Sequence, residues 1–138
     1  MRVKFEDISL AYEFVSGGMD QHHAFLCRQT GKIYFQSELS DDLDELPDDV
    51  EDEEKYLQIP GQRELHLGKA LVLDFAREVL PNDFDDVARI FRKKGAYASF
   101  KALLIRRNAL DRWYEYRDKA TDRALREWCD ENSIELIG

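Results

Sequence analysis

Hydrophobic residues near the start of the chain recur at the spacing of an α-helix. They fall three or four positions apart and are Phe5, Ile8, Tyr12 and Val15. This spacing places them on one face of a helix. The pair Gly17-Gly18 follows directly, and glycine commonly ends a helix. The pattern therefore predicts an amphipathic first helix that stops at these glycines.

Two short hydrophobic runs then flank a turn. Residues 24–27 and 32–35 are rich in apolar and aromatic side chains, and residues 28–31 between them end in a glycine. Glycine readily supplies the positive φ that a hairpin turn needs. A third run, residues 55–59, ends at Pro60-Gly61. We expect a β-hairpin and a third strand, which together form a small three-stranded antiparallel sheet.

After residue 60 the apolar spacing becomes that of helices. The first predicted helix of this region is closed by Pro81, and its apolar positions are Leu67, Leu71, Phe75 and Val79. A short helix follows, with Asn82 as its N-cap and its end near Gly95. Its apolar residues are Phe84, Val87, Ala88 and Phe91.

Two more helices complete the predicted C-terminal bundle. The next one carries Tyr97, Phe100 and Leu104 on one face. The last is long and is opened by Asn108 or Asp111. Its inward residues are Leu110, Trp113, Tyr114, Ala124, Leu125 and Trp128. Strands first and helices afterwards is the order of an α+β protein, so we predict one domain over residues 1–138: an N-terminal helix, the sheet and a bundle of about four helices.

The acidity of the chain belongs to one segment. The formal net charge is −9, yet residues 38–54 hold eleven acids and no base, which leaves 18 acids against 20 bases elsewhere. Like charges this dense repel one another and bury too little apolar surface to offset the entropy of ordering. We expect residues 38–54 to form a mobile loop that lies over, or competes for, the basic helices at low salt.

The C-terminal half carries aromatic residues at specific offsets. Residues 95–104 read G-A-Y-A-S-F-K-A-L-L, and the aromatic clusters of residues 113–118 and 124–128 follow. These segments resemble an uncharacterised protein family of short bacterial proteins, number one hundred and fifty-eight in the UPF series. The hairpin, the acidic stretch and the third strand fall in the order of that family, so the resemblance covers roughly residues 5–136. It implies a bacterial, intracellular protein and no particular activity, and Ser133 stands where glycine is common in the family.

The sequence shows no motif for catalysis, metal binding or a cofactor. No serine lies in a G-x-S-x-G turn, and Gly17-Gly18 lacks the Lys-Ser/Thr of a phosphate-binding loop. The three histidines and Cys27 lack metal-site spacing, and the acidic run lacks the glycine of a calcium loop. We expect no catalytic residue, no metal, no cofactor, and free thiols at Cys27 and Cys129. No apolar run could span a bilayer and no secretory signal opens the chain, so we expect a cytoplasmic protein without membrane contact.

Basic residues gather toward the C-terminus. Residues 87–126 hold twelve bases against four acids and interleave with aromatic residues. Such a pattern is typical of nucleic-acid surfaces, and also of solvated helices whose aromatic residues pack inward. Our first hypothesis is a non-enzymatic binding or interaction module whose partner, another protein, docks on the C-terminal helices. The alternative is nucleic-acid binding with the acidic loop as self-competitor, and an enzyme with an unrecognised site is a third. The candidate binding residues are Arg92, Lys93, Lys101, Arg107, Trp113, Tyr114 and Arg117.

Arg117 stands out on the last predicted helix. At 100° per residue it falls near the centre of the inward stripe that includes Tyr114 and Trp128. A buried guanidinium needs a carboxylate or carbonyl partner. We expect Arg117 to staple the domain rather than to bind a ligand, by pairing with an acid of the preceding helices. The candidate acids are Asp74, Asp83, Asp85 and Asp86.

Overall fold

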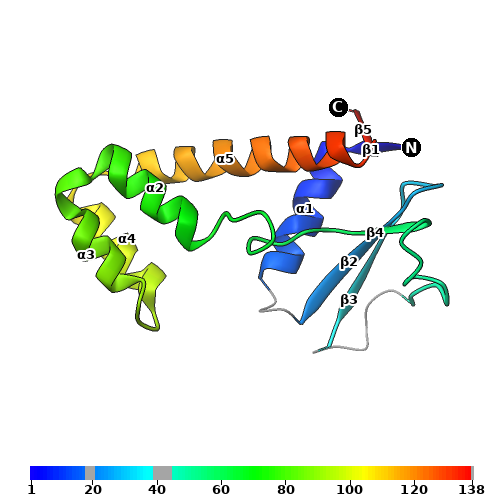
Figure 1. Ribbon diagram of the computed structural model, residues 1–138, viewed down its shortest axis with the longest axis horizontal. Coiled ribbons are helices and arrows are strands. Elements are labelled where there is room, and N and C mark those ends of the chain that lie inside the picture. The colour runs from blue at the N-terminus through cyan, green and yellow to red at the C-terminus, as the bar shows by residue number, and fades with distance from the viewer. Residues whose placement is uncertain (18–20, 39–44, 138) are drawn as a thin grey trace. The chain divides into compact units, whose positions relative to one another are not determined.

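The computed structural model describes residues 1–17, 21–38 and 45–137 and has the predicted α+β fold (Figure 1). The chain divides into two compact units, the first made of Met1–Leu65 with Arg123–Gly138 and the second of His66–Asp122. Each unit has its own buried apolar core. In the first unit this core includes Ile8, Ala24, Leu26, Ile59, Leu125 and Cys129.

The predicted hairpin and third strand form a three-stranded antiparallel sheet. Strand β2 (His22–Cys27) is central, with β3 (Ile33–Ser37) on one side and β4 (Tyr56–Gln58) on the other. The turn between β2 and β3 needs Gly31, which has a φ of 77°. A Cβ atom at this glycine would lie 3.0 Å from the backbone oxygen of Arg2. Both conformation and space therefore favour glycine here.

Helix α1 (Phe5–Ser16) covers one face of this sheet, as the amphipathic pattern predicts. Alternate residues of a strand point to opposite faces, and on β2 the fully buried Ala24 and Leu26 belong to the face under α1. The Phe14 ring packs edge-on against Phe35 and stacks on His22. The helix ends at Gly17, whose N–H donates to the Glu13 carbonyl.

A pair of very short parallel strands was not predicted. Strand β1 (Arg2–Lys4) lies beside β5 (Glu135–Ile137), with Val3 opposite Leu136. Three-residue strands from the two ends of the chain carry no local turn signal, so periodicity could not identify them. In the same unit the Arg126 guanidinium lies 4.1 Å from the centre of the Phe5 ring.

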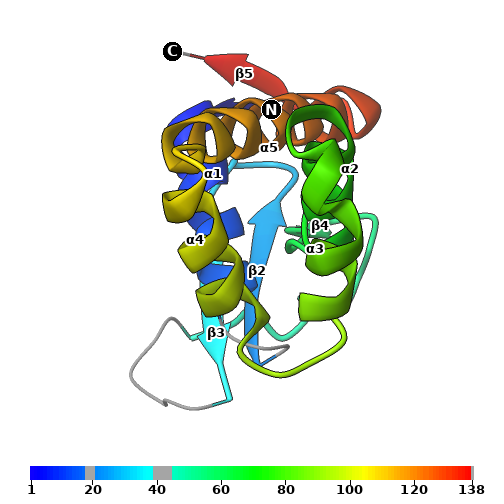
Figure 2. The same cartoon turned by 90° about the vertical axis from the view of Figure 1, so that its left-hand side faces the viewer.

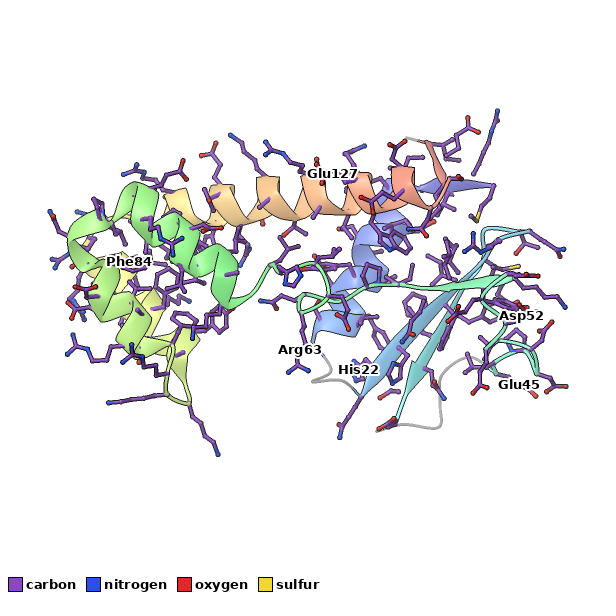
Figure 3. All side chains as sticks on the ribbon, in the orientation of Figure 1. His22, Glu45, Asp52, Arg63, Phe84 and Glu127 are labelled. Atoms are coloured by element: carbon purple, nitrogen blue, oxygen red, sulfur yellow. The ribbon has the colours of Figure 1, made fainter. Side chains whose placement is uncertain are left out.

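The described part of the acidic segment is folded into turns rather than extended. Residues 39–44 lie outside the described residues, so the prediction of a mobile loop stays a prediction there. From Pro47 to Lys55 the backbone closes successive turns, for example Val50 N–H to the Pro47 carbonyl and Lys55 N–H to the Asp52 carbonyl. Figure 3 labels Glu45 and Asp52 on this segment.

The second unit contains the predicted C-terminal helices. They are α2 (Lys69–Val79), the 3₁₀ turn η1 (Pro81–Asp83), α3 (Phe84–Ile90), α4 (Ala96–Arg106) and the first part of α5 (Leu110–Glu131). Helices α3 and α4 lie side by side (Figure 2). The core is aromatic, because the Phe75 ring makes edge contacts with Phe100, Trp113 and Tyr116 at centroid distances of 5.2 to 6.5 Å. Such geometry adds to the stabilisation from burial alone.

Both predicted asparagine caps are wrong. Asp83, not Asn82, is the N-cap of α3, and it makes no side-chain capping bond. Asn108 does not open α5 but ends α4, with a φ of 54°. The Ala109 N–H donates to the Leu104 carbonyl at 2.8 Å, and the Asn108 N–H donates to Ile105. This pair of bonds is a Schellman motif, in which asparagine tolerates the left-handed conformation.

The same motif ends α5 at Ser133. The Ile134 N–H donates to the Cys129 carbonyl at 2.8 Å, and the Ser133 N–H donates to Asp130 at 3.2 Å. Ser133 has a φ of 59°, so a residue with a Cβ occupies a position that favours glycine. Ile134 and Cys129 are both buried, which supplies the apolar contact that accompanies such a cap.

Replacing Ser133 by glycine should stabilise the protein. A left-handed non-glycine residue costs about 1–2 kcal/mol, and glycine loses about 0.5–1 kcal/mol more backbone entropy on folding, so we expect a net gain of about 0.5–1 kcal/mol. Urea denaturation followed by circular dichroism measures it. Ser133→Ala keeps the Cβ and serves as the control. Equal stability of the Gly and Ala variants would contradict the assignment.

Candidate functional site

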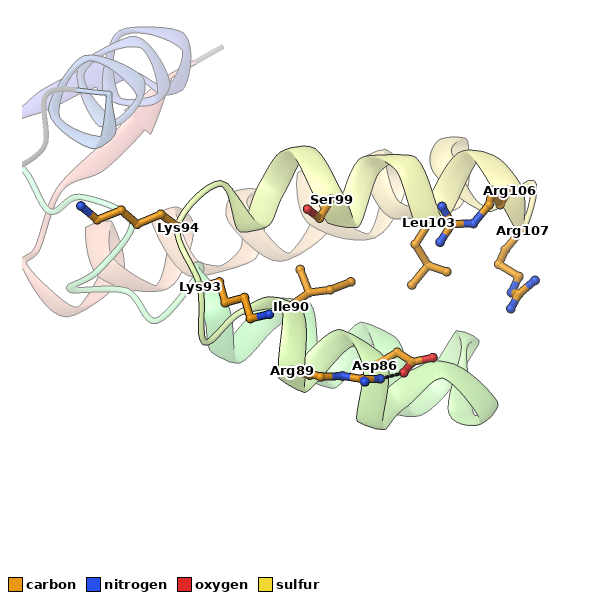
Figure 4. A pocket seen from close by; sticks show the side chains of 9 residues that line it. All are labelled: Asp86, Arg89, Ile90, Lys93, Lys94, Ser99, Leu103, Arg106 and Arg107. Carbon is orange, nitrogen blue, oxygen red and sulfur yellow. Dashed lines mark hydrogen bonds and ion pairs between the residues drawn. The ribbon is translucent and has the colours of Figure 1, made fainter.

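A pocket of 450 Å³ opens between α3 and α4 in the second unit (Figure 4). Its rim is mostly cationic, and its aliphatic side chains are Ile90 and Leu103. The described residues that line it are Asp86, Arg89, Ile90, Lys93, Lys94, Ser99, Leu103, Arg106 and Arg107. Five bases and one acid thus line a cavity large enough for several side chains of a partner.

The positive charge of this pocket follows from an acid-free stretch of sequence. Between Asp86 and Asp111 the chain holds seven bases and no acid. The connection from α3 to α4 turns sharply, because Lys93 N–H donates to the Ile90 carbonyl and Gly95 begins α4 with a φ of 72°. Lys93 and Lys94 are therefore held on an exposed turn at the mouth of the pocket.

One cation of the pocket is fixed by a buried carboxylate. Arg107 donates through Nε and through an Nη atom to the two oxygens of Asp83, both at 3.0 Å. Asp83 is only 8% exposed, whereas the Arg107 side chain is half exposed. The Arg107 hydrogen bonds hold the pKa of Asp83 below its ordinary value, and the same bonds raise the pKa of Arg107. The bidentate pair joins the turn before α3 to the end of α4 and so sets the width of the pocket at that end.

The other cations differ in their partners. Arg89 pairs with Asp86 one turn earlier on α3 (Figure 4). Lys93, Lys94 and Arg106 form no ion pair with any carboxylate of the described residues. These three side chains carry the charge that is available to an anionic ligand.

The structure brings together only some of the predicted binding residues. Lys93 and Arg107 line the pocket, and Lys101 is exposed on α4. Arg92 is exposed on the turn between α3 and α4. Trp113 is buried against Phe75 and Phe100, so its ring is part of the core and not a contact surface.

The prediction for Arg117 is wrong. Its side chain is 46% exposed and pairs with the neighbouring Asp118, and its guanidinium lies 4.9 Å from the centre of the half-buried Tyr114 ring. Near Arg117 the inward residues of α5 are Trp113, which is buried, and Tyr116, whose ring contacts Phe75, so Arg117 lies outside the face that meets the core. The staple predicted for Arg117 is made by Arg107, and its partner Asp83 is one of the four candidate acids.

The histidines and cysteines have structural contacts instead of a shared site. The ring of His22 stacks on Phe14 at 4.4 Å, and its Nδ1 lies 3.0 Å from the Phe14 carbonyl oxygen. In the described part of the chain no three His, Cys, Asp or Glu side chains come together in a way that could hold a metal. Both cysteines are free. A hydrogen bond from the Thr30 side chain lowers the pKa of Cys27, whereas burial raises the pKa of Cys129 to about 11.

The pair between Asp83 and Arg107 predicts a pH dependence of stability. A carboxylate whose pKa is lowered by folding stabilises the fold above its unfolded pKa of about 3.9, and this contribution is lost as the pH falls through the folded pKa. We expect Asp83→Asn to lower the urea midpoint at about pH 7, and the difference from the native chain to shrink at about pH 3.

The control for this experiment is Asp85→Asn, which removes an exposed carboxylate from the same helix start. It should change the midpoint little at either pH. A difference between Asp83→Asn and the native chain that is the same at both pH values would contradict a stabilising ion pair.

The comparisons with known proteins identify a family and nothing further. No curated protein and no solved structure matches the chain. Across residues 1–17, 21–38 and 45–137, no helix has both the length and the apolar character needed to cross a membrane. The model of one family matches residues 7–138, which is nearly the whole chain. This chain belongs to the Uncharacterised protein family (UPF0158), as its hairpin, acidic segment and aromatic C-terminal helices indicate.

Proposed function

We propose that this protein is a non-enzymatic, cytoplasmic binding module that docks an acidic, partly apolar segment of another protein on α3 and α4. The single observation that carries the proposal is the cationic pocket between these helices, in which Lys93, Lys94 and Arg106 form no ion pair with a carboxylate of the described residues. An anionic ligand gains more there than at a surface of mixed charge, because no internal acid has to be displaced first.

An exposed apolar surface on α4 indicates that the ligand also has an apolar part. Tyr97 is 49% exposed and Ile105 is 55% exposed, and both lie on this helix. Ala98 and Ala102 are exposed between them, which leaves room for a second helix to approach closely. A surface that combines aliphatic and small residues with cations suits an amphipathic helix that carries both leucine-like and acidic side chains.

The composition of the pocket favours a protein partner over a nucleic acid. Binding of single strands relies on aromatic rings on which bases stack, and the described residues that line this pocket include no aromatic side chain. Phe100 and Trp113 are buried against each other in the core of the unit. Nucleic-acid binding, with residues 38–54 as an internal competitor, is therefore an outcome of the test rather than our proposal.

The proposal predicts which substitutions weaken binding. The probe is a fluorescein-labelled helical peptide with one leucine face and one glutamate face, titrated by fluorescence anisotropy. The double variant Lys93→Glu with Lys94→Glu reverses the charge of two unpaired side chains and should weaken binding of the peptide about tenfold or more. Ile105→Ser should weaken it several-fold through the loss of apolar contact.

Matched controls for both changes exist in the chain. Lys69→Glu reverses an exposed cation at the start of α2, and Leu10→Ser removes a leucine that is 54% exposed on α1. Neither should alter binding. Unchanged affinity of the double lysine variant would contradict the proposal, and so would a single-stranded oligonucleotide that outcompetes the peptide at moderate salt.

A further inference from the structure

We infer that the face of the three-stranded sheet that α1 leaves uncovered is a second binding site, which takes a lysine or arginine side chain of a basic peptide. The inference does not depend on the surface of α3 and α4, because it rests on residues of the first unit alone. Its elements are aromatic rings on the sheet and carboxylates on the turn segment beside it.

The strand register places the aromatic rings on one face. Phe25 is opposite Tyr34 on β3 and opposite Gln58 on β4, and Cys27 is opposite Tyr56. Residues paired across strands share a face, and this face alternates with the one that buries Ala24 and Leu26 under α1. Phe25, Tyr34 and Tyr56 are only half buried, as rings on an uncovered sheet face would be.

A pocket of 540 Å³ lies on this face. The sheet supplies aromatic and amide side chains, and the acidic segment supplies one wall. Among the described residues the lining is His23, Phe25, Arg28, Gln36, Val50, Glu51, Glu53, Tyr56, Leu57 and Gln58. The described part of the acidic segment, residues 45–54, holds seven acids and no base, so the wall is strongly negative.

The acidic wall is fastened to the sheet. Lys55 Nζ donates to Asp49 at 2.9 Å, and the Arg28 backbone N–H donates to the Lys55 carbonyl at 2.8 Å. The Arg28 side chain donates through Nε to the Glu53 carbonyl at 3.1 Å. Among the described residues that line the pocket, the cation Arg28 is thus engaged with the backbone, and Glu51 and Glu53 line the cavity on a segment that is fastened to the sheet.

The sheet face already holds a cation on one of its rings. The Lys32 ammonium lies 4.6 Å from the centre of the Tyr34 ring, and the Tyr34 ring meets Tyr56 edge-on at 6.3 Å. An ammonium or guanidinium is attracted to the face of an aromatic ring, and neighbouring carboxylates add to this attraction. Lys32 shows within the chain the contact that a partner's lysine or arginine would make beside Phe25 and Tyr56.

Charge selects the occupant. Aromatic residues on an open sheet also suit single-stranded nucleic acid, but a phosphate backbone here would run beside seven carboxylates and be repelled. A basic peptide gains from both the rings and the acids. The site therefore takes a cationic peptide, and its ligand is opposite in charge to the ligand proposed for α3 and α4.

Isothermal titration of the full chain with acetylated, amidated hexa-arginine tests this site. We expect binding that weakens as salt rises, because the attraction is electrostatic in part. Tyr56→Leu should weaken binding about tenfold, whereas Tyr56→Phe keeps the ring and should bind like the native chain. Glu51→Gln with Glu53→Gln should also weaken it about tenfold, without any change to the sheet core.

Control variants show whether hexa-arginine binds this site or any exposed acid or aromatic ring of the chain. Glu6→Gln with Glu13→Gln removes two exposed acids of α1, and Tyr97→Leu removes an exposed ring of the second unit; neither should change the affinity. Circular dichroism verifies that each variant is folded. The inference is overturned if hexa-arginine binds the two-glutamine variant of Glu51 and Glu53 as tightly as the native chain, or if Tyr56→Leu leaves its affinity unchanged.

Discussion

Separation of like charges along the chain is the constraint from which both candidate surfaces follow. Neither core can accept unpaired charge, so the acids of residues 45–54 and the bases of residues 87–107 must remain at the surfaces of their own units. The charges of each stretch cannot neutralise one another, because residues 45–54 contain no base and residues 87–107 contain no acid. Each unit therefore presents a patch of one sign, and the two patches call for ligands of opposite charge.

The way each patch is supported differs, and the difference decides what it can bind. The basic residues are held by helices whose core is a cluster of aromatic rings around Phe75. These rings pack against one another and so are not exposed to a ligand. The acidic residues are held by turns beside a sheet of which α1 covers one face. Its second face keeps Phe25 and Tyr56 accessible, and these rings combine with the carboxylates in one cavity. Cations with small and aliphatic residues suit an acidic helix, and carboxylates with rings suit a basic peptide.

The elements that could be predicted from the sequence have strong local signals. The first helix shows four-residue periodicity and a glycine stop, and the hairpin has Gly31 at the position that needs a positive φ. The strands β1 and β5 could not be predicted, because their pairing joins residues 133 positions apart. The two helix ends at Asn108 and Ser133 were harder to predict. Asparagine is favoured both before a helix and after one, so Asn108 was assigned to the wrong helix, and serine is not a usual residue at a left-handed helix end.

The candidate sites depend on three-dimensional neighbours, which explains what sequence reasoning missed. The sequence indicates that the C-terminal helices are basic. The acid-free stretch between Asp86 and Asp111 could have limited the predicted binding surface to α3 and α4. The choice of Arg117 failed because an error of one position in the register of α5 changes which residue points inward. The sheet face was missed because it requires the pairing of Phe25 with Gln58 and the placement of Glu51 and Glu53 beside it, and neither follows from spacing.

We propose that one chain carries two separate sites for ligands of opposite charge. Amide hydrogen exchange, followed by mass spectrometry, tests this on the full chain, with the leucine–glutamate peptide in one experiment and hexa-arginine in another. We expect the acidic peptide to slow exchange in residues 87–107 alone and hexa-arginine to slow it in residues 22–37 and 45–58 alone. Protection of the same segment by both peptides, or of the helices α3 and α4 by hexa-arginine, would contradict it.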